Sequence, residues 1–227
     1  MNWSTGKDAS LAYHLLTAQS VYEVTHLLTT LSEEHDRVFM HGVREQLLDM
    51  QAERMGLPLI KVKLPASPKD DLYKTAMLQT MQTLKEDGVT AAAYGDIFLE
   101  DLRKYRVEQL AQVEITGVFP LWKRDTRDLV QLVAQSGIEA VIVCVNDKYL
   151  GKEFLGRKID ASFLADLPDN VDPCGENGEY HTFVYNAPFF SSPIDIRTGE
   201  TVYRSYKTTD DEAGWDSGFY FLDIQPV

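Results

Sequence analysis

Residues 4–10 read Ser-Thr-Gly-Lys-Asp-Ala-Ser and stand at the start of a stretch with helical periodicity. The first N–H groups of a helix have no partner within the helix, and the helix dipole places partial positive charge there. Small residues let an anion approach this backbone, while Lys7 offers a positive charge and Asp8 a carboxylate for an accompanying cation. The stretch therefore indicates either a phosphate-binding loop or an ordinary turn capped by Asp8 or Ser4.

The composition is that of a water-soluble globular protein, with 227 residues of which 44% are apolar. This length is enough for one large domain or two small ones with a sizeable core. No apolar run approaches the roughly 20 residues needed to cross a membrane, and no signal peptide is evident, so we expect a cytoplasmic protein. Two cysteines, Cys144 and Cys174, cannot form a framework of disulfides and are expected to be reduced thiols.

The net charge of −13 gives no diffuse attraction for nucleic acid, so we expect no non-specific binding of it. An anionic substrate such as ATP needs local positive groups, which Lys7 and a helix N-terminus can supply. Two basic clusters are predicted to be solvated helix faces. They are Arg103, Lys104 and Arg106, and Lys123, Arg124 and Arg127.

Strand and helix signals alternate four times in the first half of the chain. The expected strands are residues 1–3, 22–30, 59–64 and 89–94, and the expected helices are 8–19, 42–55, 68–87 and 99–113. This alternation is typical of a parallel sheet with helices on both faces. Because ligands bind beyond the carboxyl ends of such strands, the loop 4–9 and the pair Gly95-Asp96 are predicted to share one edge.

The second half predicts a smaller α+β domain. Its expected elements are a helix at 125–136, a strand at 139–145, and strands at 180–185, 194–196, 202–207 and 219–224. Residues 197–200 are predicted to turn a hairpin. We place the domains at residues 1–125 and 126–227.

A second dense polar segment, residues 172–182, reads Asp-Pro-Cys-Gly-Glu-Asn-Gly-Glu-Tyr-His-Thr. Glu176 and Glu179 are separated by a glycine, so both can bend toward one point to hold Mg²⁺, accept protons from an amine or orient a substrate. The alternative is a polar turn with its carboxylates facing solvent. His181 is expected to be a hydrogen-bonded structural residue, and its spacing from Cys174 is not that of a zinc site.

Two further positions at the predicted sheet edge are candidates for nucleotide binding. Gly95 and Asp96 can contact a nucleotide, with Asp96 on a metal or a ribose hydroxyl, although Asp96 can equally cap the following turn. His41 precedes a helix at the same edge. The patterns GxxxxGK[ST], GxGxxG and GxSxG are absent, which argues against P-loop NTPases, dinucleotide-binding proteins and hydrolases with a nucleophile elbow.

The opening loop resembles the PP-loop, SGGKDS, of N-type ATP pyrophosphatases. Taken with residues 94–97, 119–122 and 175–182, nearly the whole chain resembles the diphthine–ammonia ligase family. The resemblance implies a HUP-type parallel α/β domain that binds ATP and a smaller carboxyl-terminal domain that helps bind substrate. It also implies that a carboxylate, of diphthine or an analogue, is adenylated with release of pyrophosphate, after which ammonia displaces AMP to give an amide.

The resemblance also implies roles for individual residues. The pyrophosphate loop would comprise Ser4, Thr5, Gly6, Lys7, Asp8 and Ala9. Gly95 and Asp96 would lie beside the nucleotide, and Glu176 and Glu179 near the acceptor carboxylate or its metal. We therefore predict Lys7, Asp8, Glu176 and Glu179 as catalytic, with Asp8 a ligand of Mg²⁺. The expected partners are ATP, ammonia and a protein acceptor such as a translation elongation factor.

Two positions of the loop depart from the family pattern. Thr5 replaces Gly where a positive φ is expected, and Ala9 replaces Ser and removes a hydroxyl that can donate to a phosphate. Each loss is expected to weaken ATP binding by about 1–3 kcal/mol. A nucleotide-binding regulator without turnover is therefore an alternative to the ligase. The net charge and the lack of paired cysteines argue against a sulfur-transfer enzyme acting on tRNA.

Overall fold

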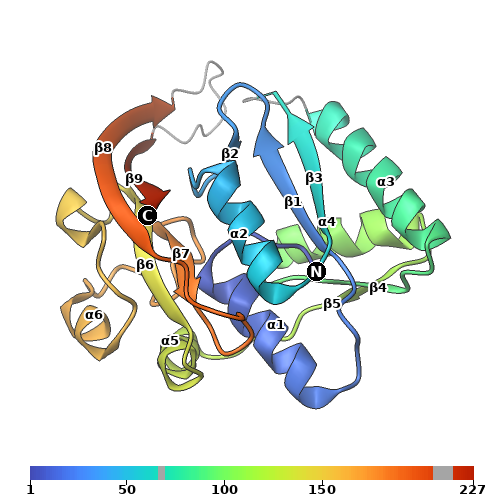
Figure 1. The fold of residues 1–227 in the computed structure, drawn as a ribbon, viewed down its shortest axis with the longest axis horizontal. Coiled ribbons are helices and arrows are strands. Elements are labelled where there is room, and N and C mark those ends of the chain that lie inside the picture. Colours follow the sequence, from blue (N-terminus) through green and yellow to red (C-terminus); the bar gives the residue numbers. More distant parts are fainter. Residues whose placement is uncertain (66–69, 207–216) are drawn as a thin grey trace.

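The computed structural model describes residues 1–65, 70–206 and 217–227. Figure 1 shows a parallel sheet with its helices in the first half of the chain and a second, antiparallel sheet beside it. Within the described ranges, no helix has both the length and the apolar character needed to cross a membrane.

The first half forms a parallel sheet that residues 1–3 complete at its centre. β1 (Leu27–Ser32) pairs with β3 (Leu59–Leu64), and β4 (Ala91–Ala93) pairs with β5 (Thr116–Val118). The N–H of Trp3 donates to the carbonyl of Leu28 in β1, and the N–H of Asn2 donates to that of Ala93 in β4. The strand order is therefore β3, β1, residues 1–3, β4, β5. The short strand β2 (Arg37–Val38) runs antiparallel to the end of β1.

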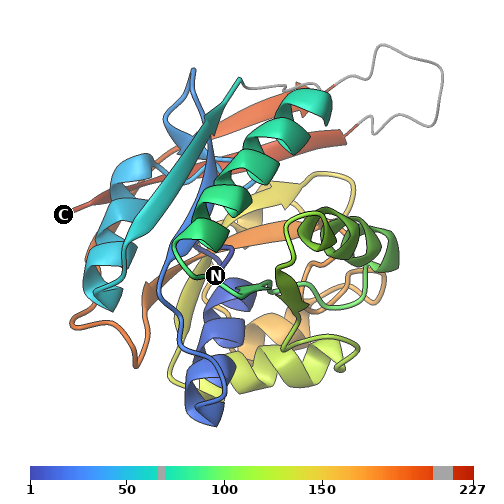
Figure 2. The same ribbon diagram turned by 90° about the vertical axis from the view of Figure 1, so that its right-hand side faces the viewer.

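Helices cover both faces of this sheet, as the sequence predicts. They are α1 (Lys7–Gln19), α2 (Glu45–Met55), α3 (Asp70–Glu86) and α4 (Glu100–Ala111). Leu27 and Leu31 of β1 pack in the core that contains the buried residues of α1 and α2, whereas Leu28 packs in the core beneath α3 and α4. Figure 2 shows α2 and α3 on opposite sides of β1 and β3. The predicted α/β class is confirmed, and the fold is HUP-like.

The second half is a four-stranded antiparallel sheet with short helices. Its elements are α5 (Thr126–Gln135), β6 (Glu139–Asn146), the 3-10 helix η1 (Lys152–Phe154), α6 (Ala161–Asp166), β7 (Tyr180–Asn186), β8 (Ile196–Tyr206) and β9 (Ser217–Pro226). The strand order is β7-β6-β9-β8. Every residue of β6 except the first is buried. This α+β arrangement is the one expected for the smaller carboxyl-terminal part.

The two halves share one hydrophobic core. Trp3, Leu11 and Leu47 from the first half lie in the same buried cluster as Val145 and Phe183 from the second. This shared packing fixes β7 against the start of α1, and so determines what faces the opening loop.

Several predicted boundaries shift. The strand expected at 22–30 begins at Leu27, and the helix expected from residue 42 begins at Glu45. Gly42 has a φ of +68°, which is outside the helical range. Pro68, the expected start of the third helix, and Lys207, the expected end of a strand, lie outside the described residues.

The predicted hairpin turn at residues 197–200 is wrong. These residues belong to β8, which is one continuous strand where two were expected, and they stay beside β9. The register shifts between Thr198 and Thr201, so an irregularity of the β-bulge kind accommodates one extra residue beside Gly199. A glycine within a strand often marks a bulge in proteins, and Gly199 does so here.

The side chain of Gln51 joins three segments of the chain. It is fully buried in α2. Its Oε1 accepts from Trp3 Nε1 at 2.8 Å, and its Nε2 donates to the carbonyls of Thr5 at 3.1 Å and Val184 at 2.6 Å. One amide therefore holds the central strand segment, the opening loop and β7 together.

Gln51→Leu is expected to lower the free energy of unfolding by about 2–4 kcal/mol, because buried polar groups of Trp3 and Val184 lose their partner. Urea denaturation followed by tryptophan fluorescence measures the change. Gln46→Leu, at an exposed position of the same helix, is the matched control and is expected to have little effect. Equal midpoints for the two variants would contradict the role given to Gln51.

Candidate active site

A cleft of about 540 Å³ lies between the edge of the parallel sheet and β7. It is lined by parts of the opening loop, by His41, by Gly95 and Asp96, and by residues from the segment 175–182. The sequence predicts that these separate segments share one edge, and the structure brings them together.

The opening loop has an unusual backbone conformation at Thr5. Thr5 has a φ of +71°, the left-handed region that a β-branched residue adopts at a cost. Its carbonyl accepts from the N–H of Val184 at 3.0 Å and from Gln51. These bonds hold the peptide in place, so the departure from glycine strains the loop without changing the positive φ expected there.

The first turn of α1 is capped by the second half of the chain. Gly6 is the N-cap residue and makes no side-chain cap, so neither Ser4 nor Asp8 caps the helix as an ordinary turn would have it. The N–H of Lys7 instead donates to Thr182 Oγ1 of β7 at 3.0 Å, and the N–H of Gly6 lies 3.4 Å from Ser4 Oγ. The loop is therefore completed from across the cleft.

Two glycines allow this close packing. A Cβ on Gly6 would lie 2.8 Å from His41 Cε1, and one on Gly95 would lie 2.9 Å from the backbone nitrogen of Ala9. Gly95 thus packs on the first turn of α1, so it shares one edge of the sheet with the opening loop, as the sequence predicts. Ala9 itself is buried in the core.

Lys7 is buried and paired beneath the loop. Its Nζ lies 2.8 Å from Asp8 Oδ2, 2.5 Å from the carbonyl oxygen of Cys174 and 4.9 Å from the centroid of the Tyr180 ring. Burial alone would lower the pKa of Lys7, but Asp8, Tyr180 and Cys174 together outweigh it, so the pKa is raised and the ammonium is retained. Burial also raises the pKa of Asp8, which Lys7 opposes.

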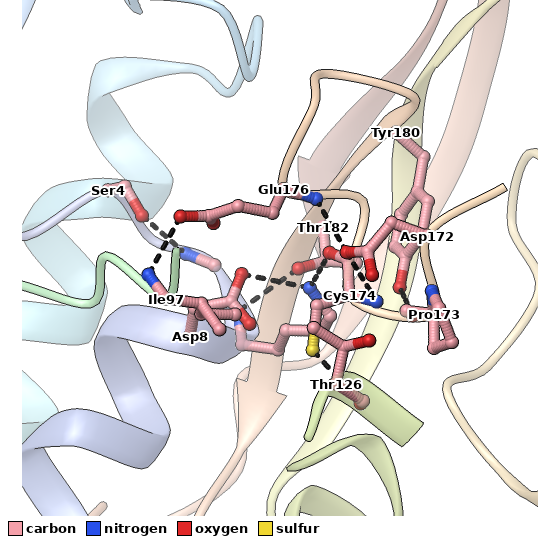
Figure 3. Close-up of polar contacts among 12 residues, drawn as sticks. Ser4, Asp8, Ile97, Thr126, Asp172, Pro173, Cys174, Glu176, Tyr180 and Thr182 are labelled. Carbon is pink, nitrogen blue, oxygen red and sulfur yellow. Dashed lines mark hydrogen bonds and ion pairs between the residues drawn. The ribbon is translucent and has the colours of Figure 1, made fainter. Parts of the chain in front are cut away.

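Glu176 extends across the cleft toward Asp8. Figure 3 shows its carboxylate near the N–H of Ile97, which donates to Oε1 at 2.7 Å. Burial is the main cause that raises the pKa of Glu176 to about 7. The negative charges of Asp8 and Asp96 also raise it, and the hydrogen bond from Ile97 lowers it. Glu176 thus changes its charge near neutrality, within range of the charges of Asp8 and Asp96.

Glu179 does not line the cleft, contrary to its predicted place beside the acceptor. Its buried carboxylate accepts from the backbone N–H of Asp172 at 3.1 Å and from the backbone and side chain of Asn177 at 2.9 and 3.0 Å. Three donors draw it into the loop, and the bend at Gly178 serves loop closure. Glu179 shapes the segment that carries Glu176.

Asp96 is paired with an arginine that the sequence does not single out. Arg106 Nε lies 2.7 Å from Asp96 Oδ2, and the guanidinium lies 4.3 Å from the centroid of the Tyr94 ring. Both Asp96 and Arg106 line the cleft. The prediction that Arg106 belongs to a solvated helix face is therefore wrong, because α4 turns this residue toward the sheet edge.

The other basic residues bear out part of that prediction. Arg103 is exposed but stacks on Phe119 and Trp122, with its guanidinium 5.2 and 4.7 Å from their ring centroids. Lys123, Arg124 and Arg127 are exposed. One sequence signal could have indicated a place for Arg106 near the cleft. Arg106 lies on α4, the helix that directly follows Gly95-Asp96 in the chain.

His41 and His181 form a pair on the cleft wall. Their ring centroids are 4.7 Å apart, and His41 Nδ1 lies 3.0 Å from the carbonyl oxygen of Thr182. Burial lowers the pKa of His41 to about 4 and that of His181 well below its usual range. Both rings are therefore neutral near pH 7. His181 Nε2 is buried and has no hydrogen-bond partner within the described ranges.

The side chains of the cleft suit a cation that binds together with phosphates. Those that the structure describes do not form a site that would hold a metal by protein ligands alone. In the part of the chain that the structure describes, no three His, Cys, Asp or Glu side chains are arranged to hold a metal. Mg²⁺ in nucleotide sites is commonly held by one or two carboxylates, with phosphates and waters completing its shell. Asp8 and Glu176 both line the cleft, and the charge of Asp8 raises the pKa of Glu176, so two carboxyl groups that could take part in such a shell are present.

A HUP-like sheet with a loop that opens a helix at its edge and a carboxylate-lined cleft is the arrangement of a nucleotide-dependent enzyme. Residues 1–117 match the family model described as the diphthamide synthase N-terminal domain, and residues 125–224 match the C-terminal domain of the same synthase. The chain belongs to the diphthamide synthase family, and it is an ATP-dependent ligase.

Curated relatives agree with this assignment. A diphthine–ammonia ligase of Danio rerio is 32% identical over 196 residues, which cover 77% of this chain and 74% of the relative. The enzyme of that name from Rattus norvegicus is 30% identical over 198 residues, 77% and 71% of the two chains. One from Schizosaccharomyces pombe is 26% identical over 226 residues, 89% of this chain and 36% of the longer relative. The family resemblance carried by the sequence motifs is confirmed.

The raised pKa of Glu176 predicts a pH-dependent stability of the ligand-free protein. Its ordinary pKa is 4.5 and its folded value is about 7, so the folded carboxyl binds a proton more tightly than the unfolded one. The stabilisation is complete below pH 4.5 and is lost as the pH rises through 7. Relative to Glu176→Gln, the unsubstituted protein is expected to lose about 1–3 kcal/mol between about pH 5 and pH 8.

Urea denaturation in a chelating buffer at several pH values measures this difference. Glu108→Gln, at an exposed position of α4, is the control and is expected to follow the unsubstituted protein at every pH. If the free energy of unfolding of Glu176→Gln also changed with pH in the same way as that of the unsubstituted protein, the carboxyl of Glu176 would not be the buried, proton-binding group described.

Proposed function

We propose that the protein is an AMP-forming ligase that adenylates the carboxylate of diphthine, or an analogue, and transfers ammonia to it. The observation that carries this proposal is the convergence of the opening loop, Asp8 and Glu176 in one cleft. The names of the curated relatives support the choice of substrate.

The loop and the first turn of α1 would hold the leaving pyrophosphate. The N–H groups of this turn lack intrahelical partners and carry the positive end of the helix dipole, although that of Lys7 already donates to Thr182 Oγ1. The ammonium of Lys7 adds a positive charge that is buried and therefore little screened by water. Adenylation requires the pyrophosphate to leave as an anion, so these groups stabilise the charge that develops. Ser4, Thr5, Gly6 and Ala9 contribute backbone to this cradle.

Asp8 and Glu176 would hold Mg²⁺ beside the phosphates. When bound, the ion neutralises phosphate charge and polarises the reacting phosphorus centre. Glu176 must lose its proton to take this role. Because its pKa is about 7, a bound cation would shift the equilibrium toward the charged carboxylate. Asp96 would fix Arg106, whose guanidinium lines the cleft and can meet the nucleotide.

We extend the proposal to the organisation and setting of the protein. The acceptor would be carried by a protein such as a translation elongation factor, and the reaction would take place in the cytoplasm. A nucleotide-binding part at 1–125 and a substrate-binding part at 126–227 are supported by the two family models, which meet near this point.

A regulator that binds nucleotide without turnover is the second candidate, favoured by the altered loop. Ala9 has no hydroxyl for a phosphate, and the positive φ at Thr5 is strained. The ligase accounts better for Glu176, because a sensor has no need of a carboxylate held across the cleft.

The deciding experiment incubates the protein with ATP, Mg²⁺, ammonium and an elongation factor that carries diphthine. The ligase is expected to release AMP and pyrophosphate and to convert the acceptor to its amide, which mass spectrometry detects. Tight ATP binding with no AMP, despite the acceptor, would establish the regulator instead.

Asp8→Asn is expected to lower pyrophosphate release about 100-fold or more and to abolish its saturation by Mg²⁺, because a cation ligand is lost. Pyrophosphate release is measured against Mg²⁺ concentration. Asp101→Asn, exposed in the first turn of α4, is the control and should match the unsubstituted enzyme. An unchanged Mg²⁺ dependence in Asp8→Asn would remove Asp8 from the metal site.

A further inference from the structure

A second, smaller cleft opens beside the candidate active site, between β2 and the strands β8 and β9. Figure 1 shows β2 on the side of the parallel sheet that faces these two strands. The volume of this side cleft is about 170 Å³. Phe39 and Met40, which directly follow β2, line both the side cleft and the candidate active site. The two hollows are therefore neighbours that share a wall.

The side cleft has an apolar wall that both halves of the chain build. In this wall Val38 is buried, Phe39 and Phe221 are half-buried, and Val202 of β8 is 43% exposed. Gly42 makes room for the ring of Phe221, since a Cβ at Gly42 would lie 2.7 Å from Phe221 Cδ1. The wall thus rests on a close contact between β9 and the segment after β2.

The polar side of the side cleft carries positive charge. Arg37 and Arg44 both bind the carboxylate of Asp223, at 2.9 and 2.7 Å, so two guanidinium groups share one carboxylate. Arg204 of β8 is exposed and lines the side cleft. Within the described ranges, it forms no ion pair and no side-chain hydrogen bond.

The remaining ionisable groups near the side cleft do not cancel this charge. Glu34 accepts from Ser32, a lining residue, at 3.2 Å, and His35 is exposed and lines the side cleft. With His35 neutral, three arginines face the carboxylates of Asp223 and Glu34, which leaves one net positive charge. The chain as a whole has a net charge of −13, so this local excess favours an anionic partner at one place on an acidic protein.

Met40 lies between the two clefts in a strained conformation. Its φ is +62°, in the left-handed region, and the residue is 58% exposed. A flexible thioether side chain adapts its shape to whatever covers it. The strained backbone therefore presents an adaptable apolar contact where the side cleft meets the candidate active site.

The candidate active site is too small for a whole protein acceptor. Its volume of about 540 Å³ is typical of a site for one small ligand. In the proposed reaction it has to hold ATP and the reacting end of the acceptor. The polypeptide that carries the carboxylate then has to lie against the neighbouring surface, and the side cleft is a hollow in that surface.

We propose that the side cleft binds the segment of the acceptor protein that flanks the residue with the reacting carboxylate. An apolar side chain of this segment covers the apolar wall, and an acidic one pairs with Arg204. This inference rests on the proposed ligase function and names the surface that recognises its acceptor. The side cleft acts on binding alone, because no step of the reaction passes through it.

Arg204→Glu is the test variant. Amide formation is measured against the concentration of the diphthine-bearing elongation factor, with ATP, Mg²⁺ and ammonium in excess. We expect the KM for this acceptor to rise about 5- to 10-fold, with kcat and the KM for ATP unaltered, because an exposed charge acts on association. Arg204→Lys keeps the charge and is expected to stay close to the unsubstituted enzyme. Val202→Gln, on the apolar wall, is expected to raise the KM about threefold.

Arg197→Glu is the matched control. It changes the same charge on the same strand, at an exposed position that does not line the side cleft, and should leave the KM unaltered. Added NaCl screens exposed charges, so the ratio of the KM values of Arg204→Glu and the unsubstituted enzyme is expected to shrink. Both substituted positions are exposed, and equal urea midpoints confirm that the variants are folded.

The other outcomes overturn the proposal. Equal KM values for Arg204→Glu and Arg197→Glu, or a KM ratio that does not depend on salt, would remove the side cleft from acceptor binding and leave the ligase intact. A raised KM for ATP would make the side cleft part of the nucleotide site. A changed molecular mass in solution, with the KM unaltered, would make it a contact between copies of this chain. Absence of AMP from the unsubstituted protein would overturn the ligase and the side cleft together.

Discussion

The buried carboxamide of Gln51 is the constraint on which the rest of the structure depends. It satisfies an indole N–H and two backbone carbonyls that come from the first residues, the opening loop and β7. No apolar side chain can replace it, because each of those groups is shut off from water. The left-handed Thr5 and the close approach of β7 to α1 both follow from this junction, and with them the position of the cleft.

Burial and neighbouring charges give the titratable side chains around the cleft different charges near neutral pH, although these side chains lie close together. Lys7 keeps its ammonium because Asp8, Tyr180 and Cys174 together offset its burial. Glu176 is half-protonated near pH 7, and the two histidines are neutral. Side chains of one small space therefore carry different charges near neutral pH.

The sequence alone predicts the parts of the site that depend on local pattern. Alternating periodicity gives the parallel sheet, and a turn of small residues before a helix gives the loop; Gly95 follows because its strand ends at the same edge. Side-chain direction within an irregular loop is not local, so Glu179, which loop closure turns inward, was misplaced. Arg106 was missed because only the packing of α4 turns it toward Asp96. The bulge in β8 resembles a turn until its partner strand is known.

The hydroxyl that caps α1 belongs to Thr182, 175 positions further along the chain. A ribosome exposes the amino-terminal segment long before it exposes that hydroxyl. The loop consequently stays unfinished while the chain is being made, with the N–H of Lys7 still turned to water. Only a polypeptide translated past β7 acquires the shaped loop, so the first residues to be made take their final form only after Thr182 has been added.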